Sequence, residues 1–135
     1  MRPGHFLDPV VGSSGRWGLR MARSGVWLAC DATLAGTSAS RRRGLAGRAA
    51  MAAGEALVIA PSQGIHTFGM RFPIDVVAVN RQGLVVRLSA EVGPRRIRLA
   101  WRAFAMIELP VGAIEAAAVR LGDVVEVVMD PIAAP

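Results

Sequence analysis

The chain has 135 residues, of which 53% are hydrophobic and 19% charged, and its sixteen arginines, with no lysine, give a net charge of +6. A chain of this length can bury a core without metal or disulfide support, and a chain this apolar is not disordered. No run reaches the roughly 18 apolar residues of a membrane span, and the first 20 residues lack the apolar segment of a signal peptide, so we predict one cytoplasmic domain.

Residues 1–24 contain four glycines and two prolines and show no hydrophobic periodicity. This pattern predicts a flexible N-terminal arm, and either Met1 or Met21 is then a reasonable start of translation. A β-rich domain is predicted over residues 25–130, followed by a short C-terminal tail at 131–135.

The early part of the domain predicts a strand and a helix. Residues 26–32 alternate as a strand does. The segment "TSASRRRGLAGRAAM" (37–51) is typical of a helix that begins after Ser38 or Ser40.

The remainder is richer in strands. Two β-branched runs flank the turn signal "NRQG", which predicts a hairpin. The predicted strands are 55–61, 65–70, the hairpin 74–90, 104–110 and 124–130, with a loop or exposed edge at 92–102 and a short helix at 111–119. The sequence therefore predicts an α+β, mainly β domain that is compact and barrel-like, with about seven strands and two short helices.

Read in order, the segments "RRRGLAGR", "IHTFGMRFPIDVVAVNRQGLVVRL", "IELPVGAIE" and "VRLGDVVEV" resemble the domain of unknown function 192 family (DUF192) over residues 26–129. The resemblance implies a compact, barrel-like β fold with short helices and no established biochemical activity. Some relatives carry secretion signals or lipoprotein anchors, and this sequence shows neither.

The sequence departs from that family at four positions. Ser62 stands where relatives often have a cysteine, Arg95 replaces a tryptophan, and Ala78 replaces a phenylalanine. Ala118 replaces a glycine, and if that position needs a left-handed backbone, alanine costs roughly 1 kcal/mol there.

The segment "GIHTFGMRFPID" (64–75) holds the only histidine of the domain. Alternation places His66 on one strand face with Phe68 and Met70, which favours a core histidine over one that lines a pocket. Asp75 either forms an ion pair with Arg71 or accepts backbone N–H groups at the mouth of a turn, and the second arrangement holds the loop in shape.

The sequence contains no recognisable pattern of a complete catalytic or metal site. Thr67 points to the strand face opposite His66, and there is no cluster of metal ligands and no phosphate-binding loop, so we predict no metal and no cofactor. Glu108 lies on a strand that looks half-buried, where a carboxylate is usually exposed or paired with an arginine such as Arg96, Arg98 or Arg102.

The leading hypothesis is a non-catalytic binding or accessory module with a polar pocket for a small anionic or peptide ligand, or for a protein partner. The candidate ligand-binding residues are His66, Thr67, Arg71, Asp75, Arg96 and Glu108. The first alternative is a hydrolase-like enzyme in which His66 acts as the base and Asp75 or Glu108 orients it.

A second alternative is weak polyanion binding, which basic proteins commonly show. Its candidates are Arg41, Arg42, Arg43, Arg95, Arg96, Arg98 and Arg102. The scarcity of aromatic residues, four Phe and three Trp without Tyr, disfavours nucleic acid as the partner.

Overall fold

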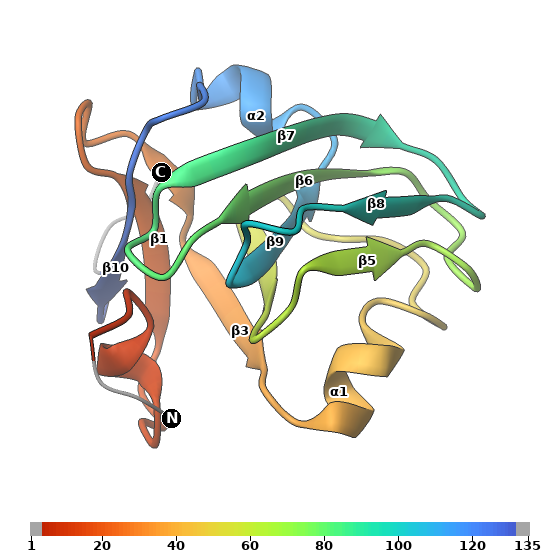
Figure 1. Ribbon diagram of the computed structural model, residues 1–135, viewed down its shortest axis with the longest axis horizontal. Helices are drawn as coiled ribbons and strands as arrows, with labels where there is room; N and C mark the ends of the chain where they lie inside the picture. The colour runs from red at the N-terminus through yellow and green to blue at the C-terminus, as the bar shows by residue number, and fades with distance from the viewer. Residues whose placement is uncertain (1–3, 132–135) are drawn as a thin grey trace.

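The fold, described for residues 4–131 by a computed structural model, consists of three β-sheets and a few short helices (Figure 1). In chain order the elements are η1 (Asp8–Val10), β1 (Trp17–Met21), β2 (Trp27–Ala29), β3 (Asp31–Ala35), α1 (Ser38–Arg43), β4 (Glu55–Ile59), β5 (Gly64–His66), β6 (Ile74–Val79), β7 (Val85–Val92), β8 (Ile97–Leu99), β9 (Ala105–Pro110), α2 (Ala113–Ala116) and β10 (Val125–Met129).

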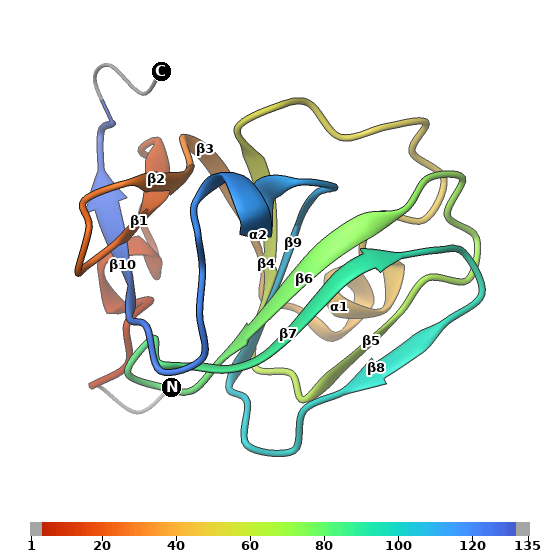
Figure 2. The same ribbon diagram turned by 90° about the horizontal axis from the view of Figure 1, so that it is seen from above.

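A five-stranded sheet with the order β3-β4-β9-β6-β7 forms the centre of the molecule. Only β3 and β4 are parallel, and the other neighbours are antiparallel. The sheet β10-β1-β2 lies on one side, and α1 and the two-stranded ribbon β5–β8 lie on the other (Figure 2).

Two hydrophobic cores fill the spaces between these layers. The first core joins the sheet β10-β1-β2 to one face of the central sheet, and the second core joins α1 and the β5–β8 ribbon to the opposite face. Along β9, Ile107 and Leu109 enter the first core and Met106 enters the second. Because side chains alternate along a strand, Glu108 shares the second face with Met106.

The predicted hairpin at 74–90 is confirmed as the antiparallel pair β6 and β7. The Asn80 side chain fixes its turn, since Oδ1 accepts the backbone N–H groups of Gln82 and Leu84, each at 3.0 Å. Gly83 completes the turn with φ 82°, a conformation that favours glycine. The strands predicted at 55–61, 104–110 and 124–130 are confirmed as β4, β9 and β10.

The predicted flexible arm is wrong over much of its length. Trp17–Met21 forms β1, the middle strand of the sheet β10-β1-β2, and Trp17, Leu19 and Met21 are all buried in the first core. A chain that began at Met21 would lack this strand. Residues 1–3 lie outside the described part, as do residues 132–135 of the predicted tail.

The helix predicted over 37–51 is also corrected, because α1 is only six residues long. Its N-cap is Thr37, whose side chain accepts the Ser40 N–H at 3.1 Å, while the Ser40 hydroxyl accepts the Thr37 N–H at 3.0 Å. The helix stops at Gly44, where φ is 49° and ψ is −127°. This backbone conformation requires glycine.

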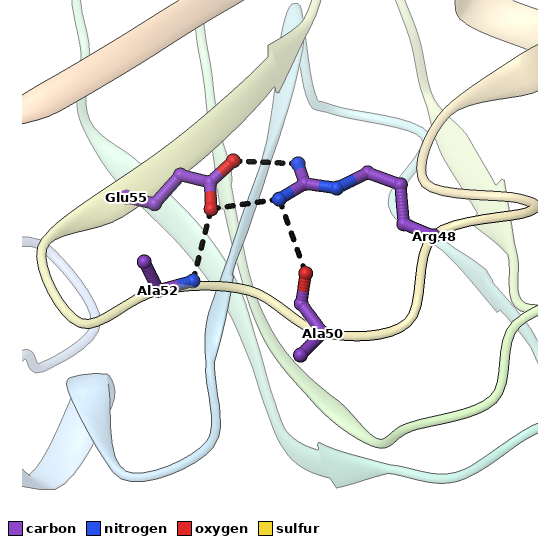
Figure 3. Close-up of polar contacts among 4 residues, drawn as sticks. All are labelled: Arg48, Ala50, Ala52 and Glu55. Atoms are coloured by element: carbon purple, nitrogen blue, oxygen red, sulfur yellow. Dashed lines mark hydrogen bonds and ion pairs between the residues drawn. The ribbon is translucent and has the colours of Figure 1, made fainter.

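A bidentate ion pair closes the loop between α1 and β4 (Figure 3). Arg48 contacts the two carboxylate oxygens of Glu55 at 2.5 and 2.9 Å and also donates to the Ala50 carbonyl, while Glu55 accepts the Ala52 N–H. The hydrogen bond from Arg48 lowers the pKa of Glu55 and, reciprocally, raises that of Arg48. These contacts fix the end of the loop where it enters β4.

Two other segments differ from prediction. The strand predicted over 26–32 is divided into β2 and β3 at Cys30, which is half-buried. The strand predicted over 65–70 contracts to Gly64–His66, and its partner is β8, within the segment predicted as a loop or edge. The first change arises because β2 joins the sheet β10-β1-β2 while β3 joins the central sheet, and the second because β5 pairs with β8 outside the central sheet.

The α+β, mainly β class is confirmed, but the sheets do not close into a barrel. The described residues contain ten strands where about seven were predicted. None of the helices in residues 4–131 has the length and apolar character needed to cross a bilayer.

We expect Ala118→Gly to stabilise the protein by roughly 1 kcal/mol, because Ala118 follows α2 with φ 50° and glycine adopts this conformation without strain. Urea unfolding would measure the change. The control is Ala116→Gly, at an exposed position inside α2, which should destabilise by a similar amount. A variant no more stable than the wild type would show that the left-handed site carries no strain.

Candidate functional site

A cavity of about 290 Å³ opens between α1, the β5–β8 ribbon and β9. We call it the Glu108 cavity. Its lining residues are Arg41, Arg42, Arg43, Gly44, Ile59, Gly64, Ile65, His66, Ile97, Leu99 and Glu108.

Glu108 lies at the base of this cavity, in the centre of the central sheet. Its neighbours across the strands are Leu57 and Val76, and its exposed fraction is 1%. The oxygen Oε1 is buried and has no hydrogen-bond partner among residues 4–131. Burial raises the pKa of Glu108 to about 7, since the ionised form loses its hydration without gaining a partner. Glu108 is therefore neither exposed nor paired with an arginine of residues 4–131, and both predicted arrangements are wrong.

Gly44 brings the end of α1 close to this carboxyl. A Cβ atom at Gly44 would lie 3.4 Å from Glu108 Oε1, and the positive φ of Gly44 also excludes other residues. Gly44 thus ends the helix and leaves space beside the carboxyl group.

Three arginines of α1, Arg41, Arg42 and Arg43, form what we call the arginine rim of the cavity. Arg41 donates to the Gly36 carbonyl at 2.8 Å. Arg42 and Arg43 are exposed, and neither forms an ion pair with any carboxylate among residues 4–131. Their charge is available to a ligand.

His66 lies at the mouth of the same cavity, and the interpretation as a core histidine is wrong. It pairs across the ribbon with Ile97 and is exposed, with its ring 5.8 Å from that of Phe68. In the described part of the chain it forms no ion pair with a carboxylate. The cause is the ribbon, which turns Ile65 into the second core and His66 away from it.

Asp75 faces away from the cavity. It alternates with Val76 along β6, so that Asp75 lies on the first-core face and Val76 on the second-core face. Its oxygens accept the backbone N–H groups of Glu91 at 2.9 Å, Gly112 at 3.1 Å and Ile114 at 3.0 Å. The prediction that Asp75 accepts backbone N–H groups is confirmed, and the alternative ion pair with Arg71 does not form.

Thr67 is a buried structural residue. Its hydroxyl donates to the Gly93 carbonyl at 2.7 Å and accepts the Arg96 N–H at 2.8 Å, which joins the end of β5 to the loop before β8. Arg96 itself is exposed and does not line the Glu108 cavity, and neither does Arg71. Of the six candidate ligand-binding residues, the structure brings only His66 and Glu108 together.

The arginine rim and Gly44 were missed as parts of the site. The sequence placed Arg41, Arg42 and Arg43 on a solvated helix face, and no local signal shows that α1 lies beside Glu108. Gly44 carried a readable signal, because glycine after "SRRR" indicates the end of a helix. The other polyanion candidates, Arg95, Arg96, Arg98 and Arg102, lie outside this cavity.

A second cavity, of about 380 Å³, lies between β2 and α2. Its lining is apolar apart from Cys30 and contains no charged side chain, so it offers nothing to bind or orient an ion. Residues 4–131 contain no group of three or more His, Cys, Asp and Glu residues that could hold a metal ion. The Glu108 cavity is therefore the better candidate site.

Comparison with known proteins supports the family and the fold. The family model DUF192, described as "Uncharacterized ACR", matches residues 20–127, and no curated protein matches the chain. A protein of unknown function from Novosphingobium aromaticivorans is 21% identical, with a TM-score of 0.69 over 82% of this chain and 83% of its own. A putative transcription regulator from Sinorhizobium meliloti is 20% identical, with a TM-score of 0.70 over 83% of this chain and 92% of its own. At these identities the two structures are similar in fold alone.

We expect the stability of the wild type to fall as the pH rises from 5 to 8. The pKa of Glu108 is near the ordinary glutamate value of 4.5 in the unfolded chain and about 7 in the folded protein. Glu108 therefore loses its proton at a lower pH in the unfolded chain than in the folded protein. Between pH 5 and 8 the free energy of unfolding decreases by roughly 2 to 3 kcal/mol as a result. Urea unfolding at several pH values would measure the slope.

The matched variant is Glu108→Gln, which has nearly the same shape and no titrating proton. Its stability should change less with pH than that of the wild type, by the amount that Glu108 contributes. If the stability of the two proteins changed equally with pH, the result would contradict a buried Glu108 carboxyl with a raised pKa.

Proposed function

The chain belongs to the DUF192 family of uncharacterised proteins, and from this premise we propose that it is a non-catalytic binding module whose Glu108 cavity holds a small anionic ligand. The observation that carries the proposal is the buried, unpartnered Glu108 carboxyl at the base of a cavity bordered by three arginines.

The arginine rim supports an anion as the ligand. A guanidinium group donates two parallel hydrogen bonds, which match the spacing of carboxylate or phosphate oxygens. Arg42 and Arg43 have no carboxylate partner within the described residues, so an incoming anion does not have to displace one.

Glu108 supports the same ligand when it is protonated. Below its pKa of about 7 the carboxyl is neutral and can donate its O–H to a buried acceptor. An anionic oxygen supplies such an acceptor. Above this pKa the ionised carboxylate would repel the ligand.

The remaining walls favour a ligand with an apolar part. Ile59, Ile65, Ile97 and Leu99 line the cavity between the arginine rim and the ribbon. A volume of about 290 Å³ is at the lower end of the range for small-molecule sites. We therefore propose a compact organic anion, such as a short-chain or aromatic carboxylate.

A second candidate is an acid–base enzyme, favoured by the shared cavity of His66 and Glu108. A carboxyl with a pKa near 7 is suited to proton transfer at neutral pH. Asp75 does not belong to this scheme, because it holds three backbone N–H groups on the other sheet face. Ser62 is occupied as well, since its hydroxyl donates to the Gly64 carbonyl at 2.7 Å.

The test is a thermal-shift screen with short alkyl and aryl carboxylates and sulfonates, each compared with its neutral amide. We expect anions to raise the melting temperature and the amides to have little effect. Arg42→Ala should weaken the best anion by roughly tenfold. Arg16→Ala, which removes an exposed arginine outside the cavity, is the matched control and should leave binding unchanged.

The affinity for a sulfonate, which stays ionised throughout, should fall by roughly tenfold as the pH rises from 6 to 8, and Glu108→Gln should abolish this dependence. Isothermal titration calorimetry would measure both. A panel in which no anion changes the melting temperature contradicts the binding proposal. Conversion of a bound anion to a product that Glu108→Gln cannot form would favour the enzyme.

A further inference from the structure

We propose that the face formed by the β5–β8 ribbon docks on an anionic lipid bilayer. Four large hydrophobic side chains of this face are exposed, and together we call them the apolar edge. They are Phe68, Ile97, Leu99 and Trp101, with exposed fractions of 50%, 57%, 63% and 79%.

The geometry of the ribbon explains why these side chains point to solvent. Ile97 pairs with His66 and Leu99 with Gly64, so these four positions share one face of the ribbon. The intervening Ile65 points the other way, into the second core. Trp101 lies in the turn after β8 and lines a shallow hollow together with Leu99, Val86 and Arg87. Phe68 follows β5, and its ring lies 5.8 Å from that of His66, so both turns add exposed side chains beside the ribbon.

The exposed charges around the apolar edge are mainly positive, and the carboxyl in the lining of the adjoining cavity, Glu108, is buried. Segments 36–54, 61–74 and 93–107, which build this side of the molecule, contain no Asp or Glu. Their arginines are Arg41, Arg42, Arg43, Arg48, Arg71, Arg95, Arg96, Arg98 and Arg102. Within residues 4–131, Arg48 alone among them forms an ion pair with a carboxylate.

An anionic bilayer matches both properties. Arginines attract anionic headgroups, and exposed Leu, Ile and Phe side chains enter the boundary between headgroups and acyl chains. Tryptophan is enriched at that boundary, because its indole ring has an apolar body and one polar N–H. A single-stranded nucleic acid would use the arginines and Trp101 but would leave Ile97 and Leu99 in water.

Sedimentation with phosphatidylglycerol and phosphatidylcholine vesicles tests the proposal on the full chain. We expect binding to phosphatidylglycerol vesicles, and little to phosphatidylcholine. Leu99→Ala and Trp101→Ala should each weaken the partition by about tenfold, since each removes apolar area that enters the bilayer. The matched control is Leu121→Ala, because Leu121 is 65% exposed but lies on the turn before β10. It should partition like the wild type.

A second set of variants tests the contribution of the arginine charges to vesicle binding. Arg95→Gln and Arg96→Gln, at two exposed positions just before β8, should each weaken binding to phosphatidylglycerol by about fivefold, and added salt should weaken it further. Equal partition into both vesicle types, an effect of Leu121→Ala as large as that of Leu99→Ala, or tight binding of single-stranded oligonucleotides that vesicles do not displace would each overturn the proposal.

The inference does not require a ligand in the Glu108 cavity. Ile97 and Leu99 also line that cavity, whereas Trp101 does not, so Trp101→Ala tests bilayer binding separately from ligand binding. Glu108→Gln should retain vesicle binding, because Glu108 is buried and does not belong to the apolar edge. A failure of the vesicle experiment would leave the anion screen unaffected, and the reverse also holds.

Discussion

The coverage of the central strands on both faces is the constraint on which the rest of the structure depends. All six residues of β6 and the first five of β9 are buried, since the sheet β10-β1-β2 covers one face and α1 and the β5–β8 ribbon cover the other. A polar side chain on these strands loses nearly all of its contact with bulk water, so it needs a hydrogen-bond partner or its neutral form is favoured. Asp75 has hydrogen-bond partners, whereas Glu108 has a raised pKa that favours its neutral form.

These two carboxyl groups, on opposite faces of one sheet, show how the same constraint gives different chemistry. Three backbone N–H groups surround Asp75 and fix the loops around α2. Glu108 lies beside Gly44, the glycine that ends α1. Because Gly44 has no side chain, the space next to the Glu108 carboxyl oxygen stays open. The candidate site therefore exists because the helix stops at Gly44, and the arginines of that short helix lie at the opening as a result.

The sequence predicted correctly those features that depend on residues close together in the chain. The hairpin of β6 and β7 followed from alternation and the Asn80 turn, and the hydrogen bonding of Asp75 followed from its position at the mouth of a turn. Non-local pairing was invisible: Trp17–Met21 has its partners at residues 125–129 and 27–29, and His66 is exposed only because β5 pairs with β8 outside the central sheet. Glu108 looked half-buried because nothing near it in the sequence reveals that α1 covers its face.

The antiparallel pairing of β1 with β10 also imposes an order on folding. Residues 17–21 align with 125–129, so the sheet that closes the first core cannot assemble until almost the whole described chain has left the ribosome. Until then β1 can pair only with β2, and the apolar side chains of Trp17, Leu19 and Met21 lack the core that covers them in the folded protein. A chain whose synthesis stopped before β10 would expose the apolar side chains of β1 to other chains. Aggregation would therefore compete with folding mainly in the last stage of synthesis.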